Sequence, residues 1–112
     1  MHPRWHKLES LSQLDEVIAQ SHTTTQIIFK HSTRCIISKM VLAQVEENMS
    51  VIPDHTNLLL LDLLSHRDIS NAIAVQLGVH HESPQVVIIK NGKAVFHESH
   101  HSIEASSMAE NC

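Results

Sequence analysis

The chain is poor in aromatic side chains, glycine and cysteine. Aromatic residues make up 3% of its 112 residues and tyrosine is absent, so aliphatic side chains must build the core. Two cysteines are too few for a disulfide framework, which favours the reducing cytoplasm over an exported protein. The length suits a single domain over residues 1–112.

Long apolar runs and a charge surplus are also lacking. The longest apolar run, 58–61, stops at Asp62, far short of the ~20 residues needed to cross a bilayer. The N-terminal "MHPRWHK" has no apolar signal core, so we expect a cytoplasmic protein. The net charge is −4 and the basic residues are scattered, which argues against nucleic-acid or acidic-membrane partners.

Hydrophobic periodicity divides the chain into alternating helices and strands. The patterns predict helices at 8–21, 35–49, 65–77 and 102–111, and strands at 26–30, 57–64, 85–90 and 93–97. Ser65 is expected to be the N-cap of the third helix, with Asp68 at its third position. The dipeptide Asn91-Gly92 predicts a tight hairpin between the last two strands.

This order of elements indicates the fold class. An early strand–helix–strand unit pairs in parallel, whereas the closing hairpin is antiparallel. The layout predicts an α/β protein with a thioredoxin-like, three-layer α/β/α sandwich around a mixed central sheet.

Cys35 is the candidate nucleophile. It lies between a predicted strand and a predicted helix, where unpaired N–H groups and the helix dipole favour a thiolate. His31 and Arg34 are possible positive charges nearby, and Ser38, one turn along, can donate an O–H hydrogen bond to the sulfur. A serine at this position cannot form a disulfide, so the pattern favours a single working thiol over dithiol chemistry.

Ser83 and Pro84 form the second part of the candidate site. In thioredoxin-like folds a cis-proline precedes the final hairpin and packs beside the cysteine, so we expect Pro84 to be cis. The backbone of Ser83 is then available to bind an incoming substrate as an added strand.

The stretches "FKHSTRCIIS", "HESPQVVIIKNG" and "VFHESHHSI" resemble the monothiol bacilliredoxin family of the bacillithiol system. The match covers about residues 10–105. The resemblance implies that Cys35 attacks mixed disulfides between bacillithiol and cytoplasmic proteins, takes up the bacillithiol, and is regenerated by a second thiol. It also implies that Ser38 fills the family's serine position, while Thr33, Arg34, Ser83 and Pro84 contact the substrate.

On this interpretation bacillithiol is a co-substrate, and neither a bound cofactor nor a metal is expected. The partners are bacillithiol-modified proteins and low-molecular-weight thiols. Two residues depart from the family pattern: Arg34 replaces a threonine before the cysteine and Ile36 replaces a proline after it. Ile36 restores an N–H that could reach the sulfur, and Arg34 could bind a carboxylate of bacillithiol.

Several alternatives remain open from the sequence. The protein could be a non-catalytic thioredoxin-like adaptor that uses only the groove beside Ser83 and Pro84. Cys112 could act as a resolving thiol or be a terminal residue without a role. Among the 11 histidines, the cluster at 97–101 could supply metal ligands. Asp62 could be a buried carboxylate near the sulfur or mark an exposed strand end.

Overall fold

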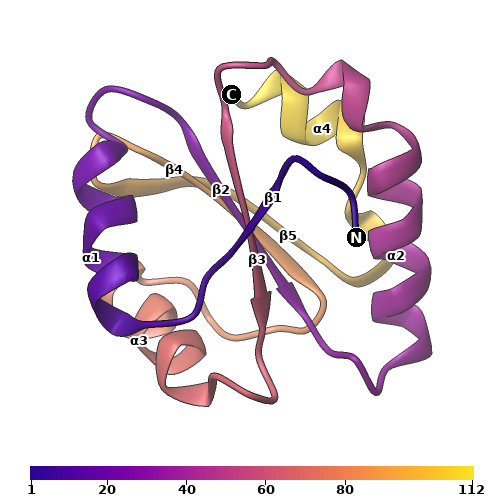
Figure 1. Ribbon diagram of the computed structural model, residues 1–112, viewed down its shortest axis with the longest axis horizontal. Coiled ribbons are helices and arrows are strands. Elements are labelled where there is room, and N and C mark those ends of the chain that lie inside the picture. Colours follow the sequence, from indigo (N-terminus) through magenta and orange to yellow (C-terminus); the bar gives the residue numbers. More distant parts are fainter.

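A mixed five-stranded sheet forms the centre of the computed structural model, which describes all residues, 1–112 (Figure 1). Along the sheet the strands follow the order β1-β3-β2-β4-β5. The first three are mutually parallel, and β4 and β5 run antiparallel to their neighbours. The strand bounds are β1 Trp5–Lys7, β2 Gln26–His31, β3 Asn57–Asp62, β4 Gln85–Lys90 and β5 Lys93–Ser99.

Helices cover both faces of the sheet, which confirms the predicted three-layer sandwich. One face carries α1 (Leu11–Gln20) and α3 (Arg67–Leu77), and the other carries α2 (Ile36–Glu47) and α4 (Ala105–Glu110) (Figure 1). Short 3-10 turns follow α2 at Met49–Val51 and β5 at His100–Ser102. None of the helices has both the length and the apolar character that crossing a membrane would require.

Two aliphatic cores lie on the two faces because neighbouring strand residues point in opposite directions. In β2, Ile28 packs beneath α1 and α3, whereas Ile27 and Phe29 pack beneath α2 and α4. Every residue of β2 is buried, since strands and helices surround it on all sides. The position of a side chain along β2 therefore decides which layer it enters.

The N-terminal segment was not predicted as a strand. Its three residues are too short to show a periodicity, yet β1 pairs with β3 and Trp5 is buried against Phe29. Arg4 fixes the segment against the turn before β3. Its guanidinium donates hydrogen bonds to the carbonyls of Met49 at 3.2 Å, Ile52 at 2.9 Å and Pro53 at 2.8 Å.

The start of α3 differs from the prediction. Its N-cap is His66, and the Ser65 hydroxyl donates instead to a carboxylate oxygen of Asp62 at 3.0 Å. That carboxylate also accepts the Leu64 N–H at 3.2 Å, so it organises the turn after β3 and leaves Ser65 outside the helix. Asp62 is half-buried as the last residue of β3.

The predicted hairpin is confirmed. Asn91 and Gly92 form a two-residue connection between β4 and β5, with φ angles of 53° and 75° that match the twist of the paired strands. The tip is tied to the end of α1, because the N–H groups of Asn91 and Gly92 donate to the carbonyl and the hydroxyl of Ser21.

Candidate active site

Cys35 is the N-cap residue of α2, on the loop that leaves the carboxyl end of β2. It is a free, half-buried thiol, and its N–H donates to the Ser32 carbonyl at 3.2 Å. No side chain caps the helix. The first-turn N–H groups therefore remain available to stabilise a negative charge on the sulfur.

Ser38 is fully buried one turn into α2. Its Oγ accepts the Ser32 N–H at 3.0 Å and lies 2.6 Å from Nδ1 of His31. The expected hydrogen bond from Ser38 to the Cys35 sulfur is not formed, because the hydroxyl already joins the end of β2 to the helix. Ser38 fixes the shape of the loop that carries Cys35.

His31 is a buried imidazole. Burial lowers its pKa, and the nearby Lys39 acts in the same direction, whereas the carboxylates of Asp62 and Glu46 oppose the shift. His31 is therefore neutral at pH 7. Of the two possible positive charges named from the sequence, the one at His31 is disfavoured, because a histidine that ends a buried strand is shielded from water.

The predicted cis peptide is confirmed between Ser83 and Pro84. In the register of β2 with β4, Lys30 lies opposite Gln85, so Pro84 and the loop of Cys35 leave the sheet at the same end. Pro84 is buried, and the Ser83 hydroxyl oxygen is buried without a hydrogen-bond partner. The two halves of the sequence pattern thus lie at the same end of two neighbouring strands.

The residues next to Cys35 are open to solvent. Thr33 and Arg34 are exposed before the cysteine, and Ile36 is 73% exposed after it. Ile37 and Met40 are 39% and 52% exposed, whereas Val41 and Val45 of the same helix are buried. The beginning of α2 therefore presents an apolar surface beside the thiol, which the periodicity alone did not reveal.

A cleft of about 290 Å³ borders the segment that leads to Cys35, although Cys35 itself does not line it. His31, Thr33, Asp62 and His66 line it, and Lys7 and Glu9 contribute side chains of opposite charge. The cleft lies where the carboxyl ends of the three parallel strands meet.

Cys112 lies far from Cys35. Its sulfur donates to the Met108 carbonyl at 3.2 Å, and it packs against the core beneath α2 and α4. Figure 1 shows the C-terminus at the opposite end of the molecule from the first turn of α2. Burial raises the pKa of the Cys112 thiol, although Thr56, Lys90 and Arg4 oppose the shift. In this structure Cys112 cannot reach Cys35.

The histidines do not gather into a metal-binding arrangement. The structure contains no group of three or more His, Cys, Asp or Glu side chains placed to hold a metal ion. His100 instead lies 3.4 Å from a carboxylate oxygen of Glu82.

Similarity to solved structures supports the same fold. One structure, described as a candidate oxidoreductase with a thioredoxin fold, is 30% identical, with a TM-score of 0.80 over 96% of this chain and 92% of the other. Thioredoxin from Trypanosoma brucei brucei is 14% identical, with a TM-score of 0.77 over 99% and 89%. Fasciola hepatica thioredoxin is 19% identical, with a TM-score of 0.71 over 94% and 93%.

The family comparison extends this from fold to chemistry. The family model of the monothiol bacilliredoxin BrxC matches residues 6–108, which include the loop of Cys35, the serine at position 38 and the Ser83–Pro84 peptide. Thiol–disulfide redox chemistry is the function that this family and the thioredoxin fold share. With a match over nearly its whole length, the chain belongs to the monothiol bacilliredoxin family.

Proposed function

We propose that the protein removes bacillithiol from mixed disulfides on cytoplasmic proteins through Cys35. The observation that carries the proposal is a single half-buried thiol at an uncapped helix N-terminus, with the buried Ser38 where a dithiol enzyme has its second cysteine. Such a thiol can accept one sulfur group, but no neighbouring thiol can displace it.

The exchange proceeds in two steps. The Cys35 thiolate attacks the bacillithiol sulfur of the mixed disulfide, the old S–S bond breaks, and the released protein sulfur takes up a proton. A second low-molecular-weight thiol, as thiolate, then attacks the bacillithiol sulfur on Cys35, which releases a disulfide and restores the Cys35 thiolate. The electrons for the reduction come from this second thiol. Ser38 cannot form an internal disulfide, so the adduct persists until that thiol arrives.

The surroundings of Cys35 supply contacts for both parts of the substrate. Arg34 is an exposed guanidinium that suits a carboxylate of bacillithiol, and the cleft beside Thr33 has room for the rest of a small thiol. The protein part would bind as an extended segment along the backbone of Ser83, beside Pro84.

A transfer experiment tests the proposal. The Cys112→Ser variant, in which Cys35 is the only thiol, is mixed with a protein carrying one bacillithiol mixed disulfide. We expect the intact mass of the variant to rise by one bacillithiol while the substrate loses the same mass. Added bacillithiol should then return the variant to its starting mass.

The double variant Cys35→Ser, Cys112→Ser is the control and should take up nothing. If the folded Cys112→Ser variant acquires no adduct yet still binds the substrate protein, the proposal is wrong. That result would favour an adaptor that binds a partner along the backbone at Ser83 and Pro84 without exchange.

A further inference from the structure

Lys30 is a fully buried lysine in the central strand. It is 0% exposed, five positions before Cys35, and its neighbour Ile28 on the same side of β2 packs beneath α1 and α3. Lys30 thus enters the layer opposite to α2 and takes no direct part in the cysteine loop. A buried ammonium group is costly unless it has partners, so the contacts of Lys30 call for an explanation.

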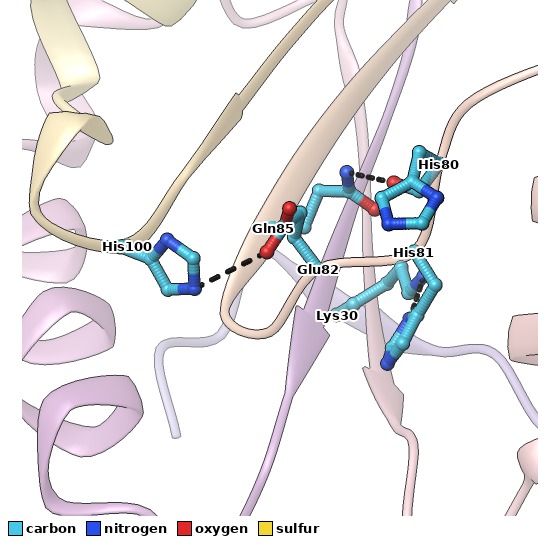
Figure 2. A network of polar contacts seen from close by, with 6 residues as sticks. All are labelled: Lys30, His80, His81, Glu82, Gln85 and His100. Atoms are coloured by element: carbon cyan, nitrogen blue, oxygen red, sulfur yellow. Dashed lines mark hydrogen bonds and ion pairs between the residues drawn. The ribbon is translucent and has the colours of Figure 1, made fainter.

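The amine binds the segment that leads into Ser83 and Pro84. Nζ of Lys30 lies 2.7 Å from Nδ1 of His81, and Figure 2 shows the two side chains pointing toward each other beneath the loop of residues 80–83. The hydroxyl of Ser70, on α3, lies 3.4 Å from the same nitrogen. The contact therefore joins the central strand to the loop that borders the candidate site.

Two further contacts hold this loop. The side-chain amide of Gln85 donates to the His80 carbonyl at 2.9 Å, and Glu82 faces His100 (Figure 2). Of the three contacts, only the one from Lys30 begins at a fully buried charged group. Its partner, His81, is exposed, so the contact runs from the core to the surface of the loop.

The chemistry of the contact requires a particular protonation state. An ammonium group can only donate, so Nδ1 of His81 must accept and its imidazole must be neutral. Burial lowers the pKa of Lys30 to about 8 against the attraction of Glu82. Desolvation of the imidazole, followed by the positive charge of Lys30, lowers the pKa of His81. His80 and Arg67 lower this pKa further, whereas Glu82 raises it. Near neutral pH the pair accordingly consists of an ammonium and a neutral imidazole.

We propose that Lys30 is a positioning residue for exchange with protein substrates. Through His81 it fixes residues 80–83, and so the backbone along which the protein part of a mixed disulfide docks beside Cys35. The inference rests on the proposed function, but it separates the docking of the protein part from the reactivity of the sulfur. Loss of the contact should slow exchange with a peptide and leave exchange with a small reagent unchanged.

Two disulfides that release the same coloured thiolate provide the test. One is a peptide of about eight residues whose cysteine is linked to 5-thio-2-nitrobenzoate, long enough to lie along an added strand. The other is the symmetric reagent 5,5′-dithiobis(2-nitrobenzoate). Both are mixed with variants in the Cys112→Ser background, so that only Cys35 reacts, and the ratio of the two rate constants is measured.

We expect the ratio of peptide to small-reagent rate constants to fall about tenfold in Lys30→Met and in His81→Leu, the effect of losing one charged hydrogen bond. His81→Gln keeps an acceptor for the amine and should retain most of the ratio. In Lys30→Met, proton NMR should also show the His81 imidazole titrating at higher pH than before, because the neighbouring ammonium is gone.

An unchanged ratio in both Lys30→Met and His81→Leu would overturn the proposal, and so would equal slowing with the two reagents. An unchanged His81 titration in Lys30→Met would overturn it as well. Since neither reagent contains bacillithiol, these results are independent of whether Cys35 accepts bacillithiol. Failure of the proposed function and failure of this inference are therefore distinguishable.

Discussion

The burial of Lys30 has a measurable effect on stability. The pKa of Lys30 is about 8 in the folded protein, against 10.5 for the unperturbed side chain. Below pH 8 the amine is protonated in both the folded and the unfolded state, and the full cost of burying the charge applies. Between about pH 8 and 10.5 the unfolded chain binds more protons, so the free energy of unfolding rises with pH.

We predict that the free energy of unfolding of Lys30→Met is higher than that of the wild type at pH 7. The difference between the two proteins should shrink by about 2 kcal/mol by pH 10. The measurement is urea denaturation followed by the fluorescence of Trp5, the single tryptophan, which is buried. Lys93→Met, at an exposed position, is the matched control and should differ from the wild type by a constant amount. A constant difference for Lys30→Met would contradict the prediction.

The sequence did not single out Lys30, and the reason is local. A lysine at the end of the apolar run "QIIFK" indicates the end of a strand. The strand in fact continues to His31, and the strand period of two puts Lys30 on the same side as Ile28. Cys35 and Pro84 were predictable because they occupy positions that a turn or a helix start defines. The partner of Lys30 comes from a loop 51 residues away, which no local pattern reveals.

At the scale of elements, every predicted helix and strand is present, and the three-residue β1 is the strand that was missed. The helix from position 36 and the Asn91-Gly92 hairpin follow from apolar spacing and turn chemistry. β1 has three residues and is held by Arg4 and by pairing with β3, both long-range effects. The cap of α3 was assigned to Ser65, but Asp62 binds that hydroxyl first.

The hairpin allows a paired test of backbone conformation. Gly92 has φ +75°, and a Cβ there would lie 3.3 Å from the His22 ring; Gly78 has φ +65° and nothing within 4 Å of an added Cβ. Gly78→Ala should cost about 1 kcal/mol from the left-handed backbone alone, and Gly92→Ala more than that. Urea denaturation of both variants checks the order.

Adding His22→Ala to Gly92→Ala removes the ring contact and should bring the cost down to that of Gly78→Ala. If the double variant is no more stable than Gly92→Ala, the ring is not the source of the extra cost.

At the scale of the whole molecule, the two cysteines lie at opposite ends of the sheet. Cys35 follows the carboxyl end of β2, while Cys112 packs near Thr56, just before β3 begins. Six strand residues separate these ends, about 20 Å. A disulfide needs Cα atoms within about 7 Å, so Cys112 cannot resolve an adduct on Cys35 while the chain is folded.

We expect iodoacetamide at pH 7.5, added below one equivalent, to modify Cys35 before Cys112. The Cys112 thiol has a raised pKa and is therefore less often a thiolate, the form that reacts. Peptide mapping by mass spectrometry after alkylation gives the order.

Treatment with diamide should yield no monomer with an internal Cys35–Cys112 disulfide. Detection of that species would show that the folded chain opens far enough for the two thiols to meet.

The alternating sides of β2 constrain how such a sequence can change over evolution. Lys30 and His31 are adjacent in the chain, yet one reaches the loop of residues 80–83 and the other holds Ser38. Deleting or inserting one residue within Gln26–His31 would exchange the two layers for every side chain beyond the change. The contact of Lys30 with His81 and the contact of His31 with Ser38 would then both be lost. Length variation among descendants should therefore be confined to the connecting loops, while this strand changes only by substitution.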